Sequence, residues 1–112
     1  MINITVVKKN QNIITIEATG HSGYAVSGQD IVCSAVSTLT QNLILGLTEV
    51  VKIKPDFVIE EDIPHLSVSL PTALNEKQMK DCQILMQSAL LGLKQVRNGY
   101  EKYIKIKEIQ HD

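Results

Sequence analysis

The sequence lacks an excess of charge of either sign, a long apolar run and a leader-like N-terminus. Its formal net charge is -1 over 112 residues, so it carries no basic field of the kind that neutralises nucleic-acid phosphates. No uninterrupted apolar run approaches the roughly 18 residues of a membrane span, and no charged leader precedes an apolar segment. These absences predict a cytoplasmic protein that binds neither nucleic acid directly nor a membrane.

Cysteine is also scarce, with only Cys33 and Cys82. In a reducing compartment, and without Cys-x-x-Cys spacing, a structural disulfide is not expected. A zinc site built from both thiols with His21 and His65 matches no usual ligand spacing, so no metal or other cofactor is expected. Each thiol therefore has to be judged by its surroundings.

The composition is that of an ordinary globular protein, with 44% hydrophobic and 21% charged residues. A chain of this length buries a core without disulfide or metal staples. We expect a single domain over residues 1–112.

Alternation of apolar and polar residues predicts the strands. Period-two patterns cover residues 2–7, 13–19, 66–70 and 103–107, and the short apolar run 57–59 is predicted to pair with 66–70 as a further strand. In the strand over 13–19, Ile14, Ile16 and Ala18 are predicted to share the apolar face, with Thr15, Glu17 and Thr19 on the other. The first two patterns are separated by a short polar stretch and predict a β-hairpin.

Apolar residues at spacings of three and four predict two helices. The first is expected to begin at Asp30 as its N-cap and to run to about residue 52, with an apolar stripe formed by Val32, Val36, Leu39, Leu43, Leu47 and Val50. The second opens at Asn75, which forms a capping box with Gln78. The order is β-β-α-β-β-α-β, and we predict an α+β two-layer sandwich with both helices on one face of a mixed sheet. Apolar surface left over on so small a domain favours a homodimer.

A glycine-rich stretch joins the hairpin to the first helix. Gly20, Gly23 and Gly28 lie within nine residues, and such a density predicts a loop with unusual dihedral angles. The loop is expected to be flexible, with Gly23 and Gly28 as hinges and Tyr24 either as a lid over a site or as an exposed side chain.

Cys33 and His21 flank this loop and are the candidate catalytic pair. A thiol in the first turn of a helix is favoured as a thiolate by the helix dipole, and a histidine across the loop is able to accept its proton. The Cys33 amide is a natural donor to a developing oxyanion. The structural alternative is that Cys33 is a small buried hydrophobe and His21 a surface residue.

Asp30 and Ser37 are candidate supporting residues. Asp30 either orients the imidazole or only caps the helix. Ser37 follows Cys33 by one turn on the same side of the helix and either lines the site or forms local hydrogen bonds. Cys82 falls on the apolar stripe of the second helix, and His65 is expected to be structural.

The pattern Gly20-His21-x-Gly23-x-Ala25-x-x-Gly28-x-Asp30-x-x-Cys33-x-x-x-Ser37 resembles the motif of the ribosomal-processing cysteine protease family, Prp. The resemblance implies a cytoplasmic, homodimeric endopeptidase that removes the N-terminal extension of large-subunit ribosomal protein twenty-seven. By this resemblance Cys33 is the nucleophile and His21 the general base, and an apolar pocket is expected for a phenylalanine-containing segment. The alternative function is that of a non-enzymatic ribosome-assembly or peptide-binding protein.

Overall fold

The computed structural model describes residues 1–20, 27–60 and 65–111, and for residues 27–30 only the backbone. The elements in chain order are β1 (Ile2–Lys9), β2 (Asn12–Gly20), α1 (Ser27–Leu45), η1 (Gly46–Val51), β3 (Asp56–Glu60), β4 (His65–Ser69), α2 (Glu76–Gly99) and β5 (Ile104–Gln110). Because η1 directly continues α1, the order is the predicted β-β-α-β-β-α-β.

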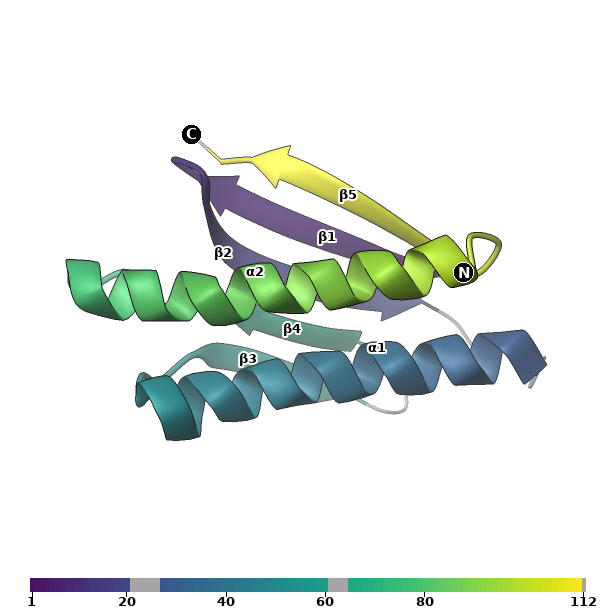
Figure 1. The fold of residues 1–112 in the computed structure, drawn as a ribbon, viewed down its shortest axis with the longest axis horizontal. Coiled ribbons are helices and arrows are strands. Elements are labelled where there is room, and N and C mark those ends of the chain that lie inside the picture. The colour runs from purple at the N-terminus through teal and green to yellow at the C-terminus, as the bar shows by residue number, and fades with distance from the viewer. Residues whose placement is uncertain (21–26, 61–64, 112) are drawn as a thin grey trace.

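The strands form one five-stranded mixed sheet in the order β3-β4-β2-β1-β5. All neighbours are antiparallel except β1 and β5, which are parallel. Both helices lie side by side on one face of this sheet, as Figure 1 shows. The predicted two-layer α+β sandwich is therefore confirmed.

A β-bulge in the hairpin corrects one prediction. The register of β1 and β2 shifts between Val7 and Lys8, so that Val7 pairs with Thr15 and Lys8 with Ile13. Ile14 is the extra residue, and Ile13 takes the fully buried position in its place. A strict alternation cannot reveal a one-residue insertion, which is why the sequence pattern predicts Ile14 rather than Ile13 on the apolar face.

The start of α1 corrects a second prediction. The helix begins at Ser27, three residues before Asp30, so Asp30 and Gly28 belong to its first turn. Asp30 is therefore not the N-cap, and Gly28 is not a hinge in a loop. Serine and aspartate both favour helix starts, and the apolar periodicity alone did not choose between these two positions.

The far end of the first helix is a π-helical segment. Each turn of η1 contains more residues than a turn of an α-helix. The side chains of η1 therefore point in other directions than continuous α-helical spacing predicts. Leu47 is fully buried, whereas Val50, predicted to lie on the apolar stripe, is 75% exposed. The segment ends at Val51, and the C-cap residue Lys52 adopts a left-handed conformation with φ 66°.

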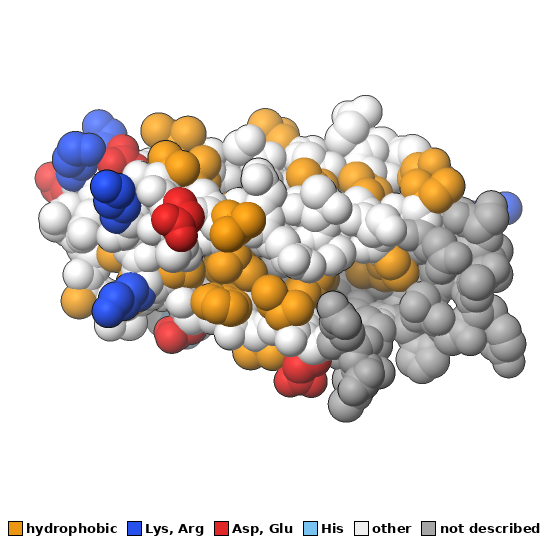
Figure 2. All heavy atoms as spheres, turned by 90° about the horizontal axis from the view of Figure 1, so that it is seen from below, with side chains coloured by type: hydrophobic (Ala, Val, Ile, Leu, Met, Phe, Trp, Pro, Cys, Tyr) orange, Lys and Arg blue, Asp and Glu red, His pale blue; other side chains and the backbone are white. Residues whose placement is uncertain are grey.

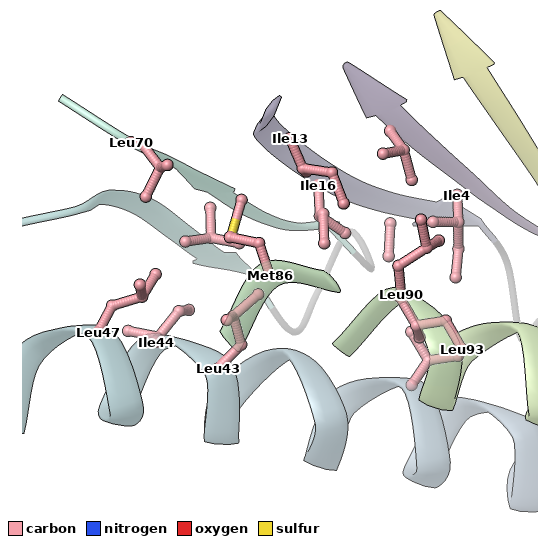
Figure 3. Packing of buried hydrophobic residues seen from close by; sticks show 14 of the residues in the cluster. Ile4, Ile13, Ile16, Leu43, Ile44, Leu47, Leu70, Met86, Leu90 and Leu93 are labelled. Carbon is pink, nitrogen blue, oxygen red and sulfur yellow. The ribbon is translucent and has the colours of Figure 1, made fainter. Parts of the chain in front are cut away.

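The core lies between the two helices and the covered face of the sheet. Figure 3 shows Leu43 and Leu47 of the first helical segment and Met86 and Leu90 of α2 pointing toward Ile16 and its neighbours on the sheet. The predicted capping box of Asn75 and Gln78 is present at the start of α2. Where the two helices pack together, Gly92 allows the close approach of Leu39, since a Cβ there would lie 3.1 Å from its Cδ2.

One helical stretch, Ile31–Val51, is long and apolar enough to cross a membrane. The sequence predicts no apolar run of this length, and the helix differs from that prediction although polar residues interrupt it. In the folded chain its inward side chains, such as Val32, Val36 and Leu43, belong to the core, while polar residues such as Ser34 and Asn42 are exposed. This amphipathic packing is typical of a core helix.

Candidate active site

The candidate site lies on the side of α1 that faces the β3 end of the sheet. Cys33 is partly exposed there, and Ser37 and Gln41 follow it at successive intervals of four residues. The Gln41 Nε2 donates a hydrogen bond of 2.8 Å to the Ser37 Oγ. The thiol and two polar side chains thus form one row along the helix.

This row borders a cavity of about 210 Å³ between α1 and the sheet. Its lining consists of Ile2, Ala18, Thr19, Gly20, Cys33, Val36, Ser37, Gln41, Ile59, Glu60, His65 and Leu66. Ile2, Ala18 and Val36 are buried. The cavity is smaller than the roughly 300–1,000 Å³ of pockets for drug-sized ligands and suits a single large side chain.

Sequence reasoning missed several residues of this cavity. Gln41 was detectable, because it continues the spacing from Cys33 through Ser37 by another turn. Glu60 and His65 were not, since their place beside Cys33 depends on how β3 and β4 join the sheet. The His65 Nε2 lies 2.8 Å from the Glu17 Oε2, so a hydrogen bond to this carboxylate holds His65 against β2.

The other predicted site residues are only partly described. His21, Gly23 and Tyr24 lie outside the described residues. For Gly28 and Asp30 the structure gives only their place in the first turn of α1. Gly20, however, lines the same cavity as Cys33 and is bonded directly to His21.

Cys33 is the seventh residue of α1 and lies in its second turn rather than its first. In an α-helix its backbone N–H has an acceptor four residues earlier, so the Cys33 amide is not one of the free donors predicted to bind an oxyanion. The field of the helix N-terminus also falls off within the first turn. An oxyanion would therefore need a donor other than this amide.

A match over nearly the whole sequence identifies the family of this chain. A family model described as "Cysteine protease Prp" matches residues 1–105. The chain belongs to the Prp family of cysteine proteases. This membership favours an enzyme over a non-enzymatic peptide-binding protein.

Individual relatives agree with the family. The "Ribosomal processing cysteine protease Prp" of Bacillus subtilis is 23% identical over 107 residues, covering 95% of this chain and 96% of the relative. The crystal structure of SMU.848 from Streptococcus mutans matches this chain with a TM-score of 0.87 and 28% sequence identity. The match covers 99% of this chain and 96% of the SMU.848 chain. An S. aureus Prp in complex with a covalently linked product peptide shares the fold at 18% identity and a TM-score of 0.81, covering 96% of this chain and 99% of its own.

Cys82 contrasts with Cys33 within this Prp-family chain. It lies on α2, is fully buried, and is surrounded by core residues. Burial raises the pKa of its thiol, and the nearby Asp81 carboxylate raises it further. A buried, protonated thiol is a poor nucleophile, so Cys82 has a packing role.

Alkylation should separate the two thiols. Under native conditions iodoacetamide is expected to modify Cys33 at least about 100-fold faster than Cys82, because Cys82 reacts only when the core opens. Peptide mass spectrometry after timed quenching measures both rates. In denaturing urea both should react at similar rates, and rapid native labelling of Cys82 would contradict the packing described here.

Proposed function

We propose that this chain is an endopeptidase that removes the N-terminal extension of large-subunit ribosomal protein twenty-seven, with Cys33 as nucleophile and His21 as general base. The observation that carries the proposal is that Cys33 and Gly20, the residue before His21, line one cavity. The matching motif residues and the name of the Bacillus subtilis relative support the choice of a ribosomal substrate.

The chemistry requires the Cys33 thiol and the His21 imidazole to come within hydrogen-bond reach of each other beside the bound peptide. His21 accepts the thiol proton, and the Cys33 sulfur attacks the carbonyl carbon of the scissile bond. The amine leaves with the proton from His21, and an acyl group stays on the sulfur. Water, deprotonated by His21, then hydrolyses this thioester and regenerates the thiol.

The cavity supplies the apolar pocket for the phenylalanine-containing segment of the extension. Ile2, Ala18 and Val36 give it an apolar floor, and burying an aromatic ring there stabilises the complex by about 1.5–3 kcal/mol. Ser37 and Gln41 at the rim have groups that hydrogen-bond peptide amides. Asp30, in the first turn of α1, remains the candidate to orient His21.

We also propose that the protein acts as a cytoplasmic homodimer. Leu45 of α1 and Ile84 and Leu91 of α2 are 60%, 68% and 68% exposed. All three residues belong to the helical layer, and Figure 1 shows this layer lying in front of the sheet. A second copy would cover this apolar surface, which is unfavourable in water.

The substrate assignment is tested by incubating the protein with the host's ribosomal protein twenty-seven, expressed with and without its N-terminal extension. Cleavage at one position within the extended form, and none in the shortened form, is expected, and intact-mass spectrometry identifies the site. Cleavage elsewhere, or equal cleavage of an unrelated unfolded protein, would contradict the assignment. No cleavage by any preparation would favour the peptide-binding alternative.

A further inference from the structure

The outer strand β3 is an exposed apolar edge. Phe57, Val58 and Ile59 are 52%, 37% and 41% exposed, and Figure 2 shows apolar side chains gathered on the face that carries α1 and β3. Among residues 1–20, 27–60 and 65–111, no strand pairs with β3 on the side away from β4. Such an edge is a template for another extended chain.

The hydrogen-bond pattern shows which groups of β3 face outward. The Leu70 amide donates to the Ile14 carbonyl at 2.9 Å, so residues 66, 68 and 70 bond toward β2 and residues 65, 67 and 69 toward β3. The β3 partners of that second set are Asp56, Val58 and Glu60. The N–H and C=O groups of Phe57 and Ile59 therefore point to the open edge.

This edge leads directly into the cavity of Cys33. Ile59 and Glu60, at the end of β3, line the cavity together with Cys33 and Ser37. A chain lying along β3 in the direction of Glu60 would therefore approach the cavity that Cys33 lines. The edge and the cavity thus form one continuous surface.

The charges on β3 indicate what kind of chain would bind. Asp56 and Glu60 lie at the two ends of the strand and are both exposed. A second copy pairing antiparallel about Val58 would place Asp56 of one protomer opposite Glu60 of the other, and directly opposed like charges are destabilising. A peptide with basic residues flanking its extended segment would instead be attracted.

We propose that the substrate binds as an added sixth strand on β3, hydrogen-bonded to the outward groups of Phe57 and Ile59. The occupant is an extended peptide with large apolar side chains at alternating positions and basic flanks. One apolar side chain enters the Cys33 cavity, and main-chain bonding to β3 holds the scissile bond near the thiol. This binding mode rests on the proposed protease function.

A proline substitution in β3 tests whether the outward N–H of this strand binds the peptide. Phe57→Pro removes one outward N–H and is compatible with an edge strand, because the N–H of Phe57 is not used by β4. Phe57→Ala is the matched control that shortens the side chain and keeps the N–H. The proline variant is expected to lower kcat/KM for the extension peptide about fivefold to tenfold relative to the alanine variant. Thermal melting and sedimentation velocity check the fold and the oligomeric state of both.

Peptides tested with the wild-type protein give an independent measurement. Single N-methyl groups are placed along the extension peptide upstream of the cleavage site. Peptides methylated at alternate positions, where the N–H would face β3, should show a kcat/KM about tenfold lower than the unmodified peptide. Peptides methylated at the intervening positions should change by less than about twofold.

The outcomes separate the two proposals. Cleavage of the unmodified peptide with no alternation in the N-methyl series would overturn binding to β3 and leave the protease function standing. A shift to a smaller species in Phe57→Pro alone would instead assign the edge to contacts between copies. If the wild-type protein cleaves neither the peptide nor the ribosomal protein, both proposals fail.

Discussion

Replacing Cys33 with alanine is expected to reduce cleavage of the extension peptide by at least about 10⁴-fold and to leave the fold intact. The reaction proposed here needs a sulfur that forms a thioester, and alanine supplies no atom that can replace it. The fold should tolerate the change, because Cys33 is only partly buried and alanine is the best helix former. Single-turnover mass spectrometry, which detects one cleaved bond per molecule, sets the lower limit of the residual rate.

Two further variants make this result specific. Cys33→Ser preserves the size of the side chain but offers a hydroxyl that is far less acidic than a thiol, so cleavage should also be lost. Cys82→Ala, by contrast, removes a buried thiol from α2 and should lower stability while keeping activity per folded molecule. If Cys33→Ala cleaves the peptide within about tenfold of the wild-type rate, Cys33 is not the nucleophile.

His21→Ala should give a smaller loss, of about 10²–10⁴-fold, which is typical of removing a general base. Its diagnostic feature is the pH profile rather than the size of the loss. The wild-type kcat/KM should rise with pH as the imidazole becomes neutral, and this rise should be absent from the variant. An unchanged profile would show that another group accepts the thiol proton.

Much of the fold could be predicted because each element carries its own pattern. The capping box of Asn75 and Gln78 and the apolar stripe of α2 are local signals, and both were correct. The errors arose where one extra residue changes which side chains of a strand or helix face the core. The bulge that moves Ile14 out of the fully buried position and the π-helical turn that exposes Val50 leave no mark in a periodic pattern.

The site residues that lie on one helix were predictable from the sequence, whereas those that other strands bring to the cavity were not. Cys33 and Ser37 were found because helical spacing places them in one row, and Gln41 obeys the same rule. Ile59, Glu60 and His65 reach the same cavity only through the pairing of β3, β4 and β2, and strand order is not contained in the alternation of any single strand. The outward hydrogen-bonding groups of β3 likewise follow from register, which only the folded chain defines.

Gly20→Ala is expected to destabilise the protein by about 2–4 kcal/mol and to impair catalysis beyond the loss of folded protein. Gly20 ends β2 with φ +146°, a conformation that residues with a Cβ rarely adopt. A Cβ would also lie 2.4 Å from the Met1 carbonyl oxygen and 2.8 Å from the Ile2 Cα. Both are backbone atoms, the first just before β1 and the second in its first residue. Relief requires β1 and β2 to separate at the end that leads into His21.

The melting temperature and kcat/KM measure the two effects of this substitution separately. A loss of this size lowers the melting temperature by about 8–20 °C in a chain of this length. Gly99→Ala is the matched control, since a Cβ there meets nothing within 4 Å and the residue ends α2 far along the chain. That variant should be neutral or slightly more stable. Gly20→Ala with wild-type stability and activity would show that the hairpin end does not need this conformation, and that the position of His21 does not depend on it.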